Sequence, residues 1–282
     1  IALAGNVLTI STPLSEFVFN EDCNSMFASL STITAIDFNN CINTANVMFM
    51  DYMFSGCIAL TSLDLSSFNT ANVMSMTNMF YDCSALSSLN LSSFNTENVM
   101  SMDNMFNKCI SLTSLNVSSF NTANVTNMSY MFDGCSALES LDLRSFNTEK
   151  VEYMNSMFYD CKKLSSLNVS SFNTANVTAM SNMFEGCERL VSLDVSSFNT
   201  EKVTSMYNMF SDCYSLTSLD LSSFDFSQVT DFGDMFDYLG SSATNKPIPI
   251  YVTQAGYDIL KDKNTYYTYR YFQYVDNDGN PY

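Results

Sequence analysis

Residues 60–85 read LTSLDLSSFNTANVMSMTNMFYDCSA, and this stretch decides the fold because the chain keeps repeating it. Near-identical copies occupy 86–111, 112–137, 138–163, 164–189 and 190–215. The Met-Phe pair at Met79-Phe80 recurs every 26 residues. Self-similarity at a fixed period of this size indicates a solenoid, in which each unit buries its apolar face only against its neighbours.

Two kinds of hydrophobic spacing follow one another within a unit. Leu63 and Leu65 alternate with polar residues, which predicts a short strand with both leucines turned inward. The next apolar residues are spaced by 3, 4 and 3 positions, and they are Val73, Met76, Phe80 and Cys83. This spacing predicts one or two turns of α- or 3₁₀-helix after the strand.

The pattern LxxLxLxxF, together with the Met-Phe-x-x-Cys segment, resembles the leucine-rich repeat. It resembles more closely the BspA-like leucine-rich-repeat surface proteins of bacteria, whose units carry MFxxC before LxxLxL and Ser-Ser-Phe-Asn-Thr after it. The units match over roughly 54–236, a degenerate unit precedes them at 26–53, and Phe68 stands where Asn or Cys usually closes the strand. The resemblance implies a right-handed leucine-rich-repeat solenoid of about eight rungs, with one continuous parallel sheet and a short helical or irregular convex side.

The flanks depart from the repeat and divide the chain into three parts. Residues 1–25 are expected to cap the first rung, 26–236 to form the solenoid, and 237–282 to form a C-terminal cap and the start of a linker or tail. In that last part, 247–252 reads as extended and 254–261 as a short helix. The tyrosine-rich run from Tyr266 to Tyr274 is interpreted as part of the cap, with carbohydrate stacking as the alternative.

Charge and composition exclude several classes of function. The chain has 11 Lys and Arg, 29 Asp and Glu, and no His, which gives a net charge of −18. Such a surface repels phosphate backbones, so nucleic acid is excluded as a partner, and no apolar run is long enough for membrane insertion. Without His, a Gly-rich phosphate loop or a nucleophile elbow, we expect no enzyme activity and no cofactor.

Nine cysteines raise the question of metals and disulfides. Seven occupy one column of the repeat at an inward position, where a free thiol behaves as a small hydrophobe. They are Cys57, Cys83, Cys109, Cys135, Cys161, Cys187 and Cys213. Zinc is disfavoured because there is neither His nor a CxxC pair. We predict buried free thiols and no metal site, with disulfides between neighbouring rungs as the alternative; the pair Cys23 and Cys41 is left open.

Three polar sets each have a structural and a functional interpretation. The outward strand column that contains Asp64 and alternates between Asp and Asn is interpreted as solvated surface, with a calcium site as the alternative. Asp231, Asp234 and Asp237 are interpreted in the same way, as a solvated helical face. The column from Asn69 to Asn199 predicts an inward ladder of stacked amides.

Ligand specificity on a solenoid must lie where outward positions break the repeat. Arg144 interrupts a column of serines, and Glu139 and Val191 interrupt a neighbouring column. The candidate ligand-binding residues are Glu139, Asp142, Arg144, Asn168, Val191 and Asp194. The alternatives for Arg144 are neutral drift or a surface ion pair with Asp142.

The BspA-like resemblance implies a secreted or cell-surface-attached protein that adheres to an extracellular or host-surface protein or glycan. Two other functions stay open. One is a passive spacer or stalk without a ligand of its own. The other is binding to ice or a polysaccharide surface through the flat face of Ser and Asp or Asn. The sequence leaves the oligomeric state undetermined.

Overall fold

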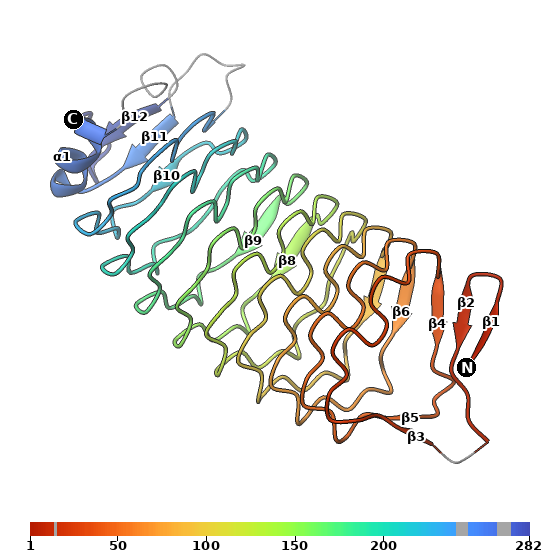
Figure 1. The fold of residues 1–282 in the computed structure, drawn as a ribbon. Coiled ribbons are helices and arrows are strands. Elements are labelled where there is room, and N and C mark those ends of the chain that lie inside the picture. Colours follow the sequence, from red (N-terminus) through yellow and green to blue (C-terminus); the bar gives the residue numbers. More distant parts are fainter. Residues whose placement is uncertain (14–15, 241–247, 264–271) are drawn as a thin grey trace.

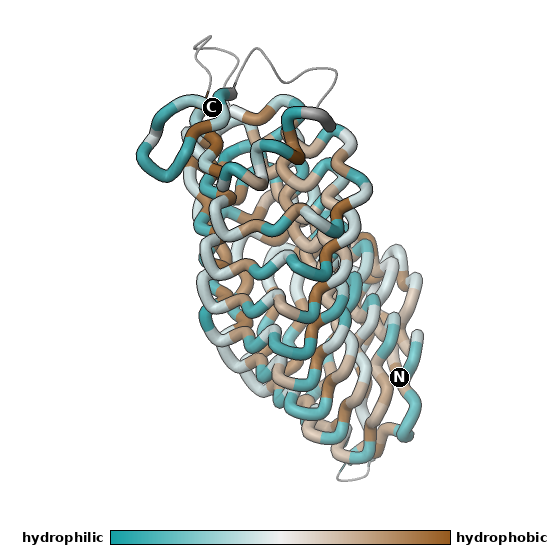
Figure 2. The backbone as a smooth tube through the Cα atoms, turned by 90° about the vertical axis from the view of Figure 1, so that its left-hand side faces the viewer, coloured by the Kyte–Doolittle hydropathy of each residue, from teal (hydrophilic) through white to brown (hydrophobic). Residues whose placement is uncertain are grey.

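The computed structural model describes residues 1–13, 16–240, 248–263 and 272–282. The chain winds into a parallel β-solenoid of about 10 turns with little helix (Figure 1). Paired positions in neighbouring turns are 26 residues apart, so residues of similar hydropathy stack in columns along the solenoid (Figure 2). The architecture predicted from the repeat is confirmed.

The LxxLxL segments form a column of short parallel strands. These strands are β4 (Ala35–Asp37), β6 (Ser62–Asp64), β7 (Ser88–Asn90), β8 (Ser140–Asp142), β9 (Ser166–Asn168) and β10 (Leu219–Asp220). Leu63 of β6 pairs with Leu89 of β7, and Leu141 of β8 pairs with Leu167 of β9. The expected continuous sheet is present as separate short ladders, among them β6 with β7 and β8 with β9. Each strand is short because the Asp or Asn that ends it also begins a turn.

The convex segments are irregular, and the helical turns predicted from the 3, 4, 3 spacing do not form. The N–H groups of Phe80 and Asp82 donate to carbonyls of the next turn, at 2.9 and 2.8 Å, and are not available for bonds within a helix. Asn78 and Asp82 have φ of 57° and 54°, a left-handed conformation that a right-handed helix does not continue. Asp234 has φ of 51°, so the acidic set around it lies on turns and not on a helical face.

A second ladder, which the helical interpretation missed, runs along another side of every turn. Single parallel bridges connect equivalent residues of successive turns, through Asp22, Phe49, Ser75, Ser101, Asn127, Tyr153, Ala179, Ser205 and Asp231. The N–H of Met74 donates to the carbonyl of Met48 at 2.8 Å, and the N–H of Met100 donates to that of Met74 at 2.9 Å. Each turn is therefore joined to its neighbours by backbone hydrogen bonds on two sides.

The interior is filled by repeated columns of identical side chains. Val73, Met76, Met79, Phe80 and Leu86 are fully buried, as are their equivalents in the central turns. The phenylalanines that include Phe80 stack with ring centroids 5.7 Å from the preceding ring and 5.6 Å from the following ring. The predicted inward residues are confirmed.

The inward polar ladder is made of threonines, and the predicted inward asparagine ladder is wrong. The Thr44 hydroxyl donates to the carbonyl of Asn69 in the next turn at 2.9 Å and accepts from the N–H of the same residue at 2.8 Å. The same pair of bonds recurs from Thr70 to Thr200, and these threonines are 0–1% exposed. The side chain of Asn69 is exposed, and its oxygen accepts the N–H of Ala71, because an Asn at this position caps its own turn.

The two ends of the chain add strands to the solenoid. The hairpin of β1 (Ala2–Ala4) and β2 (Val7–Thr9) pairs with β4, and β3 (Phe17–Val18) pairs with β5 (Ile42–Asn43). At the other end, β11 (Ile248–Tyr251) and β12 (Phe272–Val275) extend the parallel pairing of β10, and α1 spans Gln254–Lys263. The extended segment and the helix predicted there are confirmed. Tyr266, Tyr267, Tyr269 and Tyr271 lie outside the described residues.

Candidate functional site

The sequence-predicted ligand-binding residues lie along the exposed strand face. Asp142 of β8 is in register with Asn168 of β9, and both are exposed. Glu139 is exposed just before β8, and Val191 and Asp194 are exposed one turn beyond β9. The structure therefore places the predicted set over three successive turns of one face, around the pair formed by Asp142 and Arg144.

Arg144 is engaged within its own turn. Its Nε donates to Asp142 Oδ1 at 2.9 Å and its terminal nitrogen donates to Asp142 Oδ2 at 2.6 Å. These hydrogen bonds, with the charge of the guanidinium, lower the pKa of Asp142 to about 2. Both side chains are largely exposed, at 71% and 60%. The ion pair that the sequence left open as the alternative is present.

The outward Asp and Asn column closes the turn after each strand. Asp64 Oδ1 accepts the N–H of Ser66 at 3.0 Å, and Asn90 Oδ1 accepts the N–H of Ser92 at 3.1 Å. Asp and Asn both carry this oxygen, which explains why they interchange along the column. In the described ranges, no group of three or more His, Cys, Asp or Glu residues could hold a metal ion. The column has a structural role in every turn where this bond is present.

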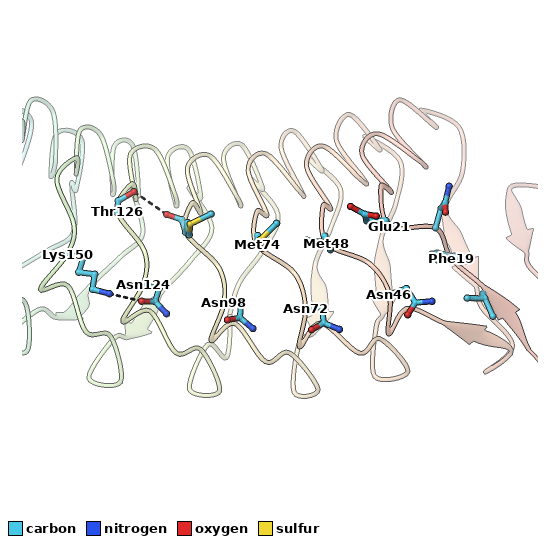
Figure 3. Close-up of a pocket in the computed structure, with 13 residues that line it drawn as sticks. Phe19, Glu21, Asn46, Met48, Asn72, Met74, Asn98, Asn124, Thr126 and Lys150 are labelled. Atoms are coloured by element: carbon cyan, nitrogen blue, oxygen red, sulfur yellow. Dashed lines mark hydrogen bonds between the residues drawn. The ribbon is translucent and has the colours of Figure 1, made fainter.

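A groove of about 1160 Å³ lies beside the second ladder, in the N-terminal half of the solenoid. Figure 3 shows its two parallel rows of side chains. One row consists of Asn46, Asn72, Asn98 and Asn124, and the other consists of Met48, Met74 and Met100. Glu21 lies at one end of the groove and Lys150 at the other (Figure 3). Sequence reasoning missed this site because it assigned Asn72 and Met74 to a helical segment.

The asparagine row is held in one orientation by the solenoid. Asn72 Nδ2 donates to the Ala45 carbonyl at 2.8 Å, and Asn98 Nδ2 donates to the Ala71 carbonyl at 2.8 Å. Only the amide nitrogen can make this bond, so each side-chain oxygen points away from the carbonyl. Within the described part of the chain, the side-chain oxygens of Asn72 and Asn98 accept no further hydrogen bond. Each of these side chains presents one free N–H and one free oxygen to the groove.

The methionine row is confined to three turns. Met48 and Met74 are half-buried, and Met100 is 53% exposed. The same column carries Thr126 and Thr178 farther along, separated by Glu152, although the backbone ladder is unchanged there. Stacking of the turns therefore does not require methionine at these positions. Methionine is flexible and polarisable, and it is common on surfaces that accept varied apolar groups.

Most of the chain matches one known protein family. A family model described as "Mycoplasma protein of unknown function, DUF285" matches residues 20–112, 84–168 and 164–259. The chain belongs to this family. The three matches overlap and together span residues 20–259, which include most of the residues that line the groove.

Among solved structures, this DUF285 chain is similar to a leucine-rich repeat protein from Bacteroides ovatus, at 17% identity and a TM-score of 0.49. The similarity covers 96% of this chain and 66% of the other, so the chain spans less than two thirds of that protein. The TLR13–ssRNA13 complex is also similar, at 15% identity and a TM-score of 0.18, over 88% of this chain and 50% of the other. No curated protein sequence matches. Over the residues that the structure describes, no helix could span a membrane.

The DUF285 chain keeps its cysteines inside the solenoid. All nine are free and buried. Cys83 Sγ donates to the Phe54 carbonyl of the preceding turn at 3.1 Å, and Cys135 Sγ donates to the Phe106 carbonyl at 3.2 Å. Burial raises the pKa of both thiols above its ordinary value, so the reactive thiolate is suppressed. The prediction of buried thiols is confirmed, and it applies to Cys23 and Cys41 as well.

Thiol labelling of the folded protein is expected to be slow at every cysteine. A thiol reagent such as DTNB should titrate few groups in native buffer and all nine after denaturation. A Ser118→Cys variant supplies the control, because this exposed position should react at once. Rapid reaction of several native cysteines, or disulfides found between successive repeats by mass spectrometry, would contradict the buried column.

A second polar feature lies on the irregular convex side. Asp133 lines a cavity of about 320 Å³ with Tyr130 and Tyr159. Burial, with a smaller contribution from Asp160, raises the pKa of Asp133 to about 6, and Lys108 opposes this shift. Asn107 Nδ2 donates to Asp133 Oδ2 at 3.3 Å. This carboxyl group is therefore more easily protonated in the folded state than in the unfolded chain.

The Asp133→Asn variant is expected to be more stable than the parent above pH 6. A carboxyl group whose pKa is raised on folding stabilises the folded state at a pH below its unfolded pKa, which is near 4 for Asp. This stabilisation is lost as the pH rises through the folded pKa of about 6. The gain at pH 8 should be about 1 kcal/mol, because solvent screens a half-buried carboxylate. Urea unfolding at pH 4 and pH 8 measures it. Asp142→Asn is the matched control, because the lowered pKa of Asp142 predicts no gain in unfolding free energy at pH 8 when this residue is replaced.

Proposed function

We propose that this chain is a non-catalytic binding scaffold of the BspA-like surface type, secreted or attached to a cell surface. It recognises an extracellular or host-surface protein or glycan along the outside of the solenoid. The observation that carries this proposal is the groove of about 1160 Å³, whose methionine row occupies only three of the turns. A concave surface with local sequence differences is typical of a recognition site.

The alternative is a passive spacer, and the groove argues against it. A spacer needs only stacked turns, and the turns that carry Thr126 or Thr178 stack as well as those that carry Met74 or Met100. Partly exposed methionines cost solubility and add nothing to the ladder. Their presence together in adjacent turns fits selection for binding. The changes at Glu139, Arg144 and Val191 support the strand face as a second candidate surface.

The burial of the cysteine thiols agrees with a non-catalytic binding function. The cysteines are buried, burial raises the pKa of thiols such as that of Cys109 well above the ordinary value, and the sequence contains no His to act as a general base. Asp133, whose pKa is raised to about 6 by burial, lies on the convex side and is not among the residues that line the groove.

Retention experiments test the proposal. The immobilised chain is incubated with extracellular-matrix and cell-surface extracts, and retained molecules are identified and titrated back as purified components. A binding scaffold retains a component with saturable affinity, and a spacer retains nothing. Arg144→Ser restores the residue of the other turns, so weaker retention by this variant at unchanged melting temperature places the contact on the strand face. Unchanged retention places it elsewhere, with the groove as the next surface to test.

A further inference from the structure

We propose that the groove binds a polypeptide segment in an extended, polyproline-II-like conformation. The asparagine row hydrogen-bonds to the backbone of this segment, and the methionine row contacts its apolar side chains. The inference rests on the proposed function, because it names the ligand class of the same groove.

A ligand in the groove must be recognised by side chains, because the backbone of the ladder beneath the groove is already hydrogen-bonded between the turns. The N–H of Met100 donates to Met74, and the N–H of Thr126 donates to Met100, both at 2.9 Å. No run of free N–H and C=O groups is available here for a ligand to add as another strand. Among the residues that line the groove, the side chains of Asn72 and Asn98 keep hydrogen-bonding groups free for a ligand.

Those groups match a peptide bond in number and in kind. Asn72 and Asn98 each offer one N–H and one oxygen, and a peptide group offers one of each in return. Because the bonds to Ala45 and Ala71 already fix these side chains, little rotamer entropy is lost when a ligand binds. A polyproline-II segment has no internal hydrogen bonds, so its backbone groups are free to pair with the row.

The spacing of the turns selects this conformation. Neighbouring parallel chains are about 4.8 Å apart, so two turns advance ~9.6 Å. Polyproline II repeats every three residues, or ~9.3 Å, and it therefore keeps register with every second asparagine. A β-strand repeats every two residues, or ~6.7 Å, and matches neither one turn nor two. The groove from Glu21 to Lys150 crosses five turn spacings, ~24 Å, which accommodates about eight residues.

The charges of the groove define the ends of the segment. Glu21 and Lys150 are the only charged residues among those that line it, and the lining residues of the four turns between them are uncharged. The Lys150 ammonium donates to the neutral Asn124 Oδ1 at 2.7 Å and keeps its positive charge available to a ligand. The complementary segment is apolar in the middle, with a basic group at the Glu21 end and an acidic group or C-terminal carboxylate at the Lys150 end.

A glycan fits the groove less well. Sugar rings are commonly held by stacking on exposed aromatic rings, and the aromatic residue of the lining, Phe19, is 2% exposed. The methionine row offers soft apolar contact without a flat ring face. The observations therefore favour a polypeptide over a carbohydrate as the occupant.

A random 12-residue peptide library displayed on phage tests the proposal. It is panned against the full chain, with the Met48→Thr, Met74→Thr, Met100→Thr triple variant as the counter-selection. This variant carries the residue found in other turns of the same column, so its melting temperature should be unchanged. We expect enriched peptides with apolar residues three positions apart. Labelled peptides from this selection should bind the triple variant about tenfold more weakly in fluorescence anisotropy.

The asparagine row has its own matched pair of variants. Asn98→Ala and Asn176→Ala each remove a bond to a carbonyl of the preceding turn, at 2.8 and 2.9 Å, but only Asn98 lines the groove. Peptide affinity should fall in the first and stay unchanged in the second. Three results overturn the inference: no enrichment over the triple variant, equal loss in both asparagine variants, or groove-dependent binding on a glycan array without peptide binding. If extracts are still retained when the peptide test fails, the proposed function stands and this inference alone is withdrawn.

Discussion

Phe132→Ala is expected to cost about 3–5 kcal/mol of unfolding free energy, because it opens a cavity in the middle of a stacked column. The Phe132 ring is fully buried between Phe106 and Phe158, with centroid separations of 5.7 and 5.8 Å. In a solenoid each turn is stabilised mainly by its two neighbours, so this change weakens the interface on both sides. Urea unfolding followed by circular dichroism measures the loss.

Phe27→Ala is the control at the end of the same column. Phe27 is 5% exposed and stacks on one ring, Phe54, at 5.5 Å, while Phe38 meets it edge-on at 5.7 Å. The loss should be smaller because a terminal turn has one repeat neighbour and can relax around the cavity. Equal losses at the two positions would show that the column does not act as a continuous stack.

The period of the sequence was sufficient to predict the stacking. When a unit recurs at constant length, every inward position repeats, and columns such as the one that contains Phe80 and the one that contains Cys83 can be identified without a structure. Their burial is confirmed. The conformation within a unit was harder to predict, because Val73, Met76 and Phe80 have helical spacing while the segment is irregular.

A usable signal for the irregular segment was present in the sequence. The column of Asp82 contains Gly56, Gly134 and Gly186, and all four residues have positive φ. Glycine that alternates with Asp at one position indicates a left-handed residue, which excludes a helix through that point. The Asn72-Val73-Met74 alternation also indicated a second extended segment, but three residues are too few to outweigh the helical spacing.

The candidate site was only partly predictable, because the conformation within a unit decides which columns face outward. Breaks in the repeat, such as Arg144, can be read directly, and its pairing with Asp142 was one of the alternatives. The groove depends on which columns face outward beside the second ladder and on residues 18–21, which lie outside the repeat yet line its end. The methionine row could therefore be assigned to the surface only after the second ladder was known.

Thr122→Val is expected to cost about 2–4 kcal/mol, although it keeps the size and shape of the side chain. The Thr122 hydroxyl donates to the Asn147 carbonyl at 2.9 Å and accepts the Asn147 N–H at 2.8 Å. Thr122 is 1% exposed, so water cannot easily replace the hydroxyl, and the variant leaves the N–H and the carbonyl of Asn147 without this partner. The ladder would lose one of its connections between turns while the apolar packing is kept.

Two further variants separate the hydroxyl from the methyl group. Thr122→Ser keeps both hydrogen bonds and removes only a methyl group, so it should cost about 1 kcal/mol and less than the valine variant. Thr126→Val alters an exposed threonine whose hydroxyl donates to the Met100 carbonyl at 3.3 Å, and its unfolding free energy should change little. If Thr122→Val were neutral in urea unfolding, the Asn147 groups would have other partners, and the threonine column would be a packing feature. If serine proved as costly as valine, the methyl group would be the stabilising part. The expected order, valine most costly and serine less, follows because an unpaired buried backbone group costs more than a lost methyl contact.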